Sequence, residues 1–125
     1  MTDPKGIIPP LVTPLLDERT LDGKGTERLV DHVIEGGAHG LFVLGTTGEG
    51  PSLSYTLRIE FIERVCEHVE GRVPVLVGIT DSSFAQAIQV SKAASDLGAQ
   101  AVVLAPPFYF QIESAELHAF VDRII

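Results

Sequence analysis

The stretch 41–51, LFVLGTTGEGP, joins a short apolar run to a polar segment that is rich in glycine. Four consecutive apolar residues, 41–44, are typical of a strand in a parallel sheet that is covered on both faces. Two threonines and a glutamate follow at once, among Gly45, Gly48 and Gly50. Parallel α/β folds carry their functional residues just beyond the C-terminal ends of strands, so this stretch indicates both a fold class and a candidate site.

Apolar runs of strand length alternate with amphipathic segments along the rest of the chain. We expect strands near 7–12, 41–45, 73–78 and 101–105, and helices near 25–35, 55–70, 83–97 and 114–125. The first strand carries prolines and is expected to be irregular. Successive strands begin about thirty residues apart, which is the size of a βα unit. This pattern predicts an α/β protein with a parallel sheet.

Two architectures fit this alternation: a small doubly wound sheet, or part of a (β/α)₈ TIM barrel, which needs about 250 residues. The last amphipathic stripe runs to Ile124 and Ile125 without a capping signal. We therefore expect one partial TIM-barrel domain over 1–125, the N-terminal half of the barrel with about four βα units. The open sheet edges would need a partner. The alternative is a last helix that docks onto its own complete domain.

The composition of the chain limits the kinds of partner that it is expected to bind. The net charge of −8 disfavours nucleic acid and anionic membranes, which require a basic face. Neither an apolar run of about 20 residues nor a signal-peptide layout is present. Cys66 is the single cysteine, so no disulfide framework or zinc pattern exists. We expect a cytoplasmic protein without a metal, since the histidines lack the spacing of ligands. They are His32, His39, His68 and His118.

Polar residues gather where the predicted strands end. These are Thr13, 46–49, 80–82 and Tyr109. Hydroxyl groups and the accessible backbone N–H groups of glycine-rich turns hold small carboxylates or phosphates. The turn is no P-loop, because no Gly-Lys-Ser/Thr follows it. In the alternative interpretation, Thr46 and Thr47 are ordinary loop residues and Glu49 only favours the N-terminus of the next helix.

Four segments together resemble one protein family. They are PPLVTPL at 9–15, GLFVLGTTGEGPSLS at 40–54, VPVLVG at 73–78 and GAQAVVLAPPFYF at 98–110. Their order and spacing are similar to those of the dihydrodipicolinate synthase / N-acetylneuraminate lyase family of class I pyruvate-dependent aldolases. The resemblance covers essentially the whole chain, and the Gly-Thr-Thr-Gly-Glu element is its most specific part.

This resemblance implies a (β/α)₈ barrel that condenses or cleaves pyruvate with an aldehyde, through a Schiff base on a barrel lysine. It implies no metal or organic cofactor. Thr47 matches the residue that binds the pyruvate carboxylate, with backbone N–H groups around Gly45 and Gly48 beside it. Thr46 matches the hydroxyl of a proton relay. Tyr109 resembles the relay tyrosine that reaches into a neighbouring subunit, which implies a homo-oligomer, either a dimer or a tetramer.

The chain also departs from the family pattern. The Schiff-base lysine of the family lies on the sixth strand and a second relay tyrosine follows the fifth, so neither falls within these residues. Lys5, Lys24 and Lys92 do not lie at predicted strand ends, where a desolvated nucleophilic amine is needed. We expect the chain alone to be inactive. The loop 78–83, GITDSS, is more similar to relatives that act on sugar-derived 2-oxo acids than to the synthases.

Two other functions stay open at this point. A non-catalytic half-barrel could bind a small carboxylate or act as a self-associating scaffold. A doubly wound binding domain could share the aldolase pattern by chance. A lysine on a later strand separates the enzyme from the first of these alternatives.

Overall fold

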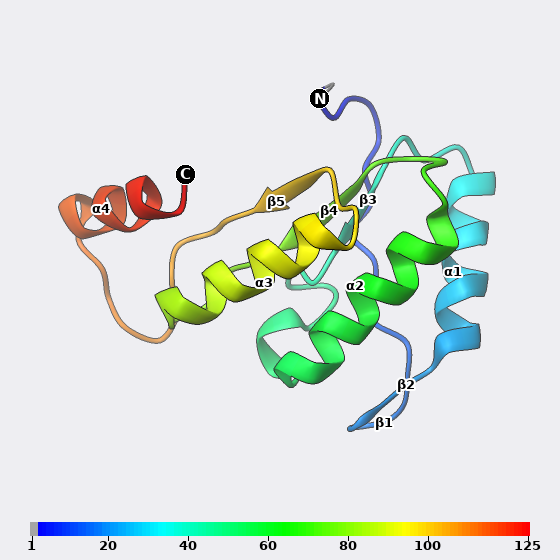
Figure 1. The fold of residues 1–125 in the computed structure, drawn as a ribbon, viewed down its shortest axis with the longest axis horizontal. Coiled ribbons are helices and arrows are strands. Elements are labelled where there is room, and N and C mark those ends of the chain that lie inside the picture. Colours follow the sequence, from blue (N-terminus) through cyan, green and yellow to red (C-terminus); the bar gives the residue numbers. More distant parts are fainter. Residues whose placement is uncertain (1–2) are drawn as a thin grey trace.

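The computed structural model describes residues 3–125 and shows a small parallel sheet with helices packed against it (Figure 1). The strands are β1 (Leu15–Asp17), β2 (Thr20–Leu21), β3 (Leu41–Val43), β4 (Val75–Gly78) and β5 (Ala101–Val103). The helices are α1 (Gly23–Glu35), α2 (Tyr55–Val69), α3 (Phe84–Asp96) and α4 (Ser114–Ile124), with a short 3₁₀ turn at Gly50–Ser52. The chain is therefore an α/β protein, as the alternating pattern predicts.

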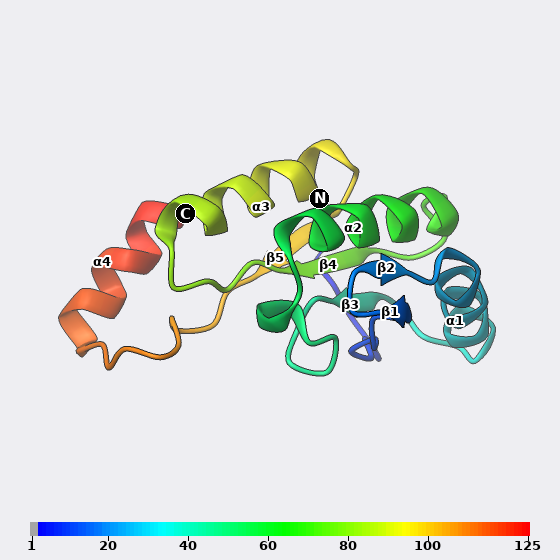
Figure 2. The same cartoon turned by 90° about the horizontal axis from the view of Figure 1, so that it is seen from below.

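The main sheet has the order β3-β4-β5 and is parallel throughout. Helices α2 and α3 lie side by side on one face of it (Figure 2). Strand residues on that face, such as Val43 and Val77, are fully buried. The other face carries Phe42 and Leu76, which are register partners and only partly buried. Within residues 3–125 the helices thus cover one face of the sheet, whereas the apolar strands had suggested two covered faces.

The segment expected as a first strand at 7–12 forms only an isolated parallel bridge, between Pro10 and Phe42. Phe42 accepts a hydrogen bond from Leu11 N–H (2.8 Å) and donates one to the Pro9 carbonyl (3.1 Å). A regular ladder cannot form here, because Pro9 and Pro10 have no N–H group to donate. The segment nevertheless runs beside β3, in the position that a first barrel strand would take. An unexpected antiparallel hairpin, β1–β2, follows it.

The core lies between the sheet and its helices. Phe61, Ile62 and Val65 of α2 are fully buried against it, and Val30 of α1 is buried as well. Helix α4 contains no buried residue and stands beyond the end of α3, away from the centre of the sheet (Figure 1). Its Phe120 meets Phe84 of α3 edge-on, with ring centroids 6.0 Å apart.

None of the helices described in residues 3–125 is both long enough and apolar enough to cross a lipid bilayer.

The end of β3 is fixed by a close backbone contact. Leu44 follows the strand with a positive φ of 59° and is only 4% exposed. Its carbonyl group lies so near Gly50 and Gly78 that a Cβ atom at either position would collide with it. The neighbour in each case is backbone, which cannot swing aside. Glycine is therefore required at both positions for the chain to reverse here.

We predict that Gly78→Ala destabilises the protein by about 1–3 kcal/mol, because the new methyl group must displace the Leu44 carbonyl. Gly23→Ala is the matched control, since a Cβ there meets only the mobile end of Arg64. Its free energy of unfolding should change by less than about 0.5 kcal/mol or rise slightly. Urea unfolding followed by circular dichroism measures both, and equal unfolding midpoints for the two variants would contradict the steric argument.

Candidate functional site

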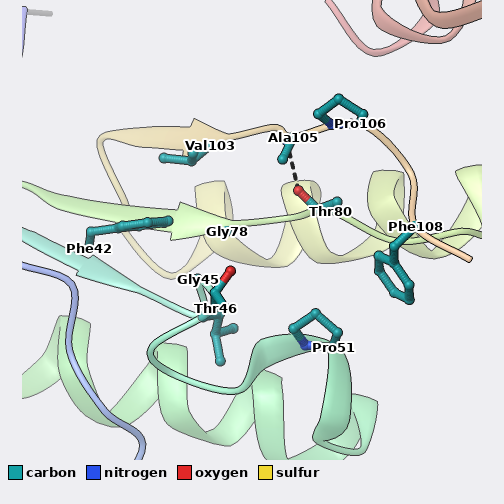
Figure 3. A pocket seen from close by; sticks show the side chains of 11 residues that line it. Phe42, Gly45, Thr46, Pro51, Gly78, Thr80, Val103, Ala105, Pro106 and Phe108 are labelled. Carbon is teal, nitrogen blue, oxygen red and sulfur yellow. Dashed lines mark hydrogen bonds between the residues drawn. The ribbon is translucent and has the colours of Figure 1, made fainter.

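A cavity of about 430 Å³ lies at the C-terminal ends of β3, β4 and β5 (Figure 3). It is lined by Phe42, Leu44, Gly45, Thr46, Pro51, Gly78, Thr80, Val103, Ala105, Pro106 and Phe108. Its floor is the less covered face of the sheet, and its walls are the loops that follow the three strands. Apolar walls with few polar groups are typical of a small-molecule site.

The turn after β3 forms one wall. Two backbone hydrogen bonds close it, from Glu49 N–H to the Thr46 carbonyl (3.0 Å) and from Gly50 N–H to the Gly45 carbonyl (3.2 Å). Buried Thr13, which follows the irregular first segment, donates its hydroxyl to the carbonyl of Gly48 (2.7 Å). The polar residues expected at the ends of the first two strands are thus brought together.

This turn presents several donors that the protein does not use. Within residues 3–125, the backbone N–H groups and the hydroxyl groups of Thr46 and Thr47 donate no hydrogen bond, and neither does Gly48 N–H. The Thr46 hydroxyl points toward the space beneath Gly78 (Figure 3). Thr47 is exposed and does not line the cavity. Consecutive free N–H groups with hydroxyls beside them form a concavity that suits an anion such as a carboxylate.

The opposite wall comes from the loops after β4 and β5. Ala105 N–H donates to the Thr80 hydroxyl oxygen at 2.8 Å, which joins these two loops (Figure 3). Ser82 donates its hydroxyl to the carbonyl of Phe108 at 2.7 Å, a second link between them. This contact holds the backbone of Phe108, whose side chain lines the cavity.

A buried ion pair lies behind these walls. Arg58 Nη1 is 3.2 Å from Asp81 Oδ2, and both side chains are less than a tenth exposed. Tyr55 donates its hydroxyl to the same oxygen (2.8 Å), and Ser83 N–H donates to Oδ1 (2.7 Å). Burial raises the pKa of Asp81, but the hydrogen bonds from Ser83, Tyr55 and Arg58 outweigh it, so the pKa falls below its usual value. The hydrogen bond to this carboxylate is also the main reason that the pKa of Tyr55 is raised.

Tyr109 lies apart from the turn residues. It is 90% exposed, and its ring packs edge-on against Phe110 with centroids 4.8 Å apart. Its backbone has a positive φ of 77°, an unusual conformation for a tyrosine. It does not line the cavity of its own chain, whereas the preceding Phe108 does.

Sequence reasoning overlooked Arg58. A signal was present, because Arg58 lies four residues before Ile62 and seven before Val65, on the apolar side of α2. A charge at such a position needs a buried partner. Asp81 was noted only as part of a polar group at a strand end, without this role.

The lysines of the chain lie away from the cavity. Lys5, Lys24 and Lys92 are exposed, and none of them lines the cavity. In the described part of the chain, no three His, Cys, Asp or Glu side chains come together in a way that could hold a metal ion. Cys66 is partly buried, which raises the pKa of its thiol to about 11 and makes it a poor nucleophile.

Comparison with known proteins places this geometry in a family. The sequence model of the dihydrodipicolinate synthetase family matches residues 3–125. A 4-hydroxy-tetrahydrodipicolinate synthase of Salinibacter ruber is 37% identical over 120 residues, which are 96% of this chain and 40% of that protein. The chain therefore spans about two fifths of the length of this relative.

Solved structures show the same fold. The dihydrodipicolinate synthase of Bacteroides thetaiotaomicron superimposes with a TM-score of 0.92 at 52% identity, over 98% of this chain and 41% of that one. YagE of Escherichia coli K12, a member of the same family solved in complex with pyruvate, gives 0.91 at 34% identity, over 95% and 40% of the two chains. The four βα segments are thus a partial TIM barrel, and the chain belongs to the dihydrodipicolinate synthetase family.

Proposed function

We propose that this chain provides the carboxylate-binding half of the active site of a lyase or synthase that forms a Schiff base with pyruvate. The observation that carries the proposal is the turn after β3, whose unused N–H and hydroxyl groups stand at the rim of a cavity formed by strand ends. Family membership supports it, as does the relative that was solved with pyruvate.

In this proposal the turn residues have two roles, carboxylate binding and proton transfer. Thr47, with the N–H groups around Gly45 and Gly48, holds the pyruvate carboxylate, because an anion needs several convergent donors. Thr46, whose hydroxyl points into the cavity, passes a proton to or from the reacting substrate. Tyr109 completes this relay from a neighbouring copy, in agreement with its exposure and with its absence from the cavity lining of its own chain.

The second substrate in this proposal is an aldehyde, condensed with pyruvate or released from a 2-oxo acid. Phe42, Pro106 and Phe108 give the cavity an apolar wall, and Thr80 already accepts a hydrogen bond from Ala105. The loop 78–83 favours a sugar-derived 2-oxo acid. The Salinibacter relative is instead named a 4-hydroxy-tetrahydrodipicolinate synthase, and the Bacteroides relative a dihydrodipicolinate synthase. We place the protein in the cytoplasm, where a lone thiol such as Cys66 stays reduced.

Incubation with pyruvate and borohydride should leave the mass of this chain at 13.4 kDa. A Schiff base requires an unprotonated amine beside the bound carboxylate, and the lysines of this chain are exposed and away from the cavity. Intact-mass spectrometry checks this. A reduced pyruvate adduct on Lys5, Lys24 or Lys92 would contradict the proposed absence of a nucleophile from this half of the site.

Thr47→Val should weaken pyruvate binding about 10- to 100-fold, since it removes one hydrogen bond to a charged group. The measurement is a pyruvate titration followed by the backbone amide signals of Thr46, Thr47 and Gly48 in NMR spectra. Thr56→Val is the matched control, because Thr56 is exposed on α2 outside the cavity. A control that loses as much affinity as Thr47→Val would contradict the assigned role, and a chain whose signals do not respond to pyruvate would contradict the proposed function.

We further propose that the chain associates with itself. Strand β5 ends the sheet without a partner on its outer side in the described residues, and Tyr109 and Phe110 are 90% and 70% exposed. Phe110→Ser should shift the population toward monomer in sedimentation velocity. Leu16→Ser, at an equally exposed apolar residue of β1, should not. Self-association without any pyruvate response would favour the alternative of a non-catalytic scaffold.

A further inference from the structure

We propose that Arg58 and Asp81 are positioning residues whose ion pair holds the turn 46–48 in the shape that binds a carboxylate. Neither residue lines the cavity, so both act through other groups. The inference rests on the proposed function, because it concerns the affinity of the same turn for the same kind of ligand.

Arg58 contacts the segment 51–53, which leads from the turn to α2. Its Nε donates to the Leu53 carbonyl (3.1 Å), and its Nη2 donates to the Pro51 carbonyl (3.2 Å). Its guanidinium carbon also lies 4.6 Å from the ring centroid of Tyr55. The planar guanidinium thus fixes two backbone carbonyls on the segment that connects the turn to α2, and Pro51 itself is part of the cavity wall.

Asp81 carries the constraint to the loop after β4. Its Oδ2 accepts from Arg58 and Tyr55, and its Oδ1 accepts from Ser83 N–H at the start of α3. The adjacent Thr80 is joined to the loop after β5 by Ala105. These polar contacts, joined by the peptide bond between Thr80 and Asp81, therefore link all three loops around the cavity, from Pro51 to Ala105.

The turn depends on such external support. Two backbone hydrogen bonds close the turn from within. Within residues 3–125, Thr13 provides the side-chain hydrogen bond to the turn backbone, at the carbonyl of Gly48. A loop that must be ordered by its ligand loses affinity to the entropy of ordering, whereas a preorganised loop does not. Because the Arg58 charge is buried, losing Asp81 leaves it unpaired and frees the guanidinium to move from the two carbonyls toward water.

The test uses the 125-residue chain with Asp81→Asn, and Asp31→Asn as the matched control. Asp31 of α1 forms an exposed ion pair with Arg72 (2.9 Å), which lies just beyond α2, and the same oxygen is 3.0 Å from His68 Nε2. None of these residues lines the cavity. The same chemical change is thus made in both places. Two quantities are measured on the folded protein: the pyruvate dissociation constant, and the hydrogen-exchange rates of the Glu49 and Gly50 amides that close the turn.

For Asp81→Asn we expect pyruvate affinity to fall about tenfold or more, and exchange at Glu49 and Gly50 to rise about tenfold. Both quantities should stay within about twofold for Asp31→Asn. A residue that only stabilised the fold would lower the urea midpoint and leave the dissociation constant of the folded protein unchanged. Unchanged affinity and unchanged exchange in Asp81→Asn overturn the inference.

Arg58→Lys separates charge from geometry. The compact ammonium group of lysine keeps the charge beside Asp81 but lacks the planar fork that contacts Asp81 and the carbonyls of Pro51 and Leu53 together. We expect this variant to lose affinity like Asp81→Asn, and full rescue by lysine would overturn a role for the two carbonyl contacts. If Asp81→Asn does not fold, Tyr55→Phe decides the question, with an expected loss of about threefold because it removes one donor and keeps the ion pair.

The two proposals fail in different ways. If the wild-type chain never binds pyruvate, the proposed function is overturned, and the expected effect on affinity falls with it. Faster exchange at Glu49 and Gly50 in Asp81→Asn would then still show that the loops are coupled. A wild-type chain that binds pyruvate, with Asp81→Asn binding equally well, overturns only the positioning role.

Discussion

The close approach of the Leu44 carbonyl to Gly50 and Gly78 is the constraint on which the site depends. Leu44 is buried with a positive φ, a conformation that a leucine adopts only when its surroundings enforce it. The side chain stays in the core while the backbone reverses direction. The next residues are therefore delivered to the rim of the cavity with their N–H groups unused. A larger residue at Gly50 or Gly78 would push this reversal outward, so the two glycines serve the site as much as the fold.

The two faces of the sheet differ in burial: one packs against helices, and the other lines the cavity. The face under α2 and α3 holds fully buried residues such as Val43 and Val77, and it provides most of the hydrophobic stabilisation. The other face carries Phe42 and Val103, which line the cavity and stay partly accessible. In a barrel this second face points inward, so its incomplete burial in the described residues is what a partial barrel requires. The polar loops that line the cavity lie at the C-terminal edge, where helix N-termini and free backbone N–H groups are available.

Much of this fold could be read from the sequence, because hydrophobic periodicity reports burial directly. The helices begin and end within about two residues of their expected bounds. The prolines correctly predicted that the first segment is irregular. The polar residues of the strand ends were found for the same reason. The positive φ of Leu44 could not be predicted, since it results from tertiary packing that overrides the preference of the residue. The pairing of Arg58 with Asp81 was missed because it joins residues that are 23 positions apart, one in α2 and the other in the loop after β4.

The contacts of Thr13, Arg58 and Asp81 around the turn explain why a short stretch of chain can form a carboxylate site. A turn that binds an anion through its backbone N–H groups binds more tightly when its shape is already fixed before the ligand arrives. Here the support comes from neighbouring strand ends: Thr13 from the segment before, and Asp81 through Arg58 from the loop after. Each supporting residue lies at the same edge of the sheet as the turn itself. The parallel sheet therefore does more than place functional residues at one edge, because its fixed strand spacing also brings the residues that hold them rigid within hydrogen-bonding reach.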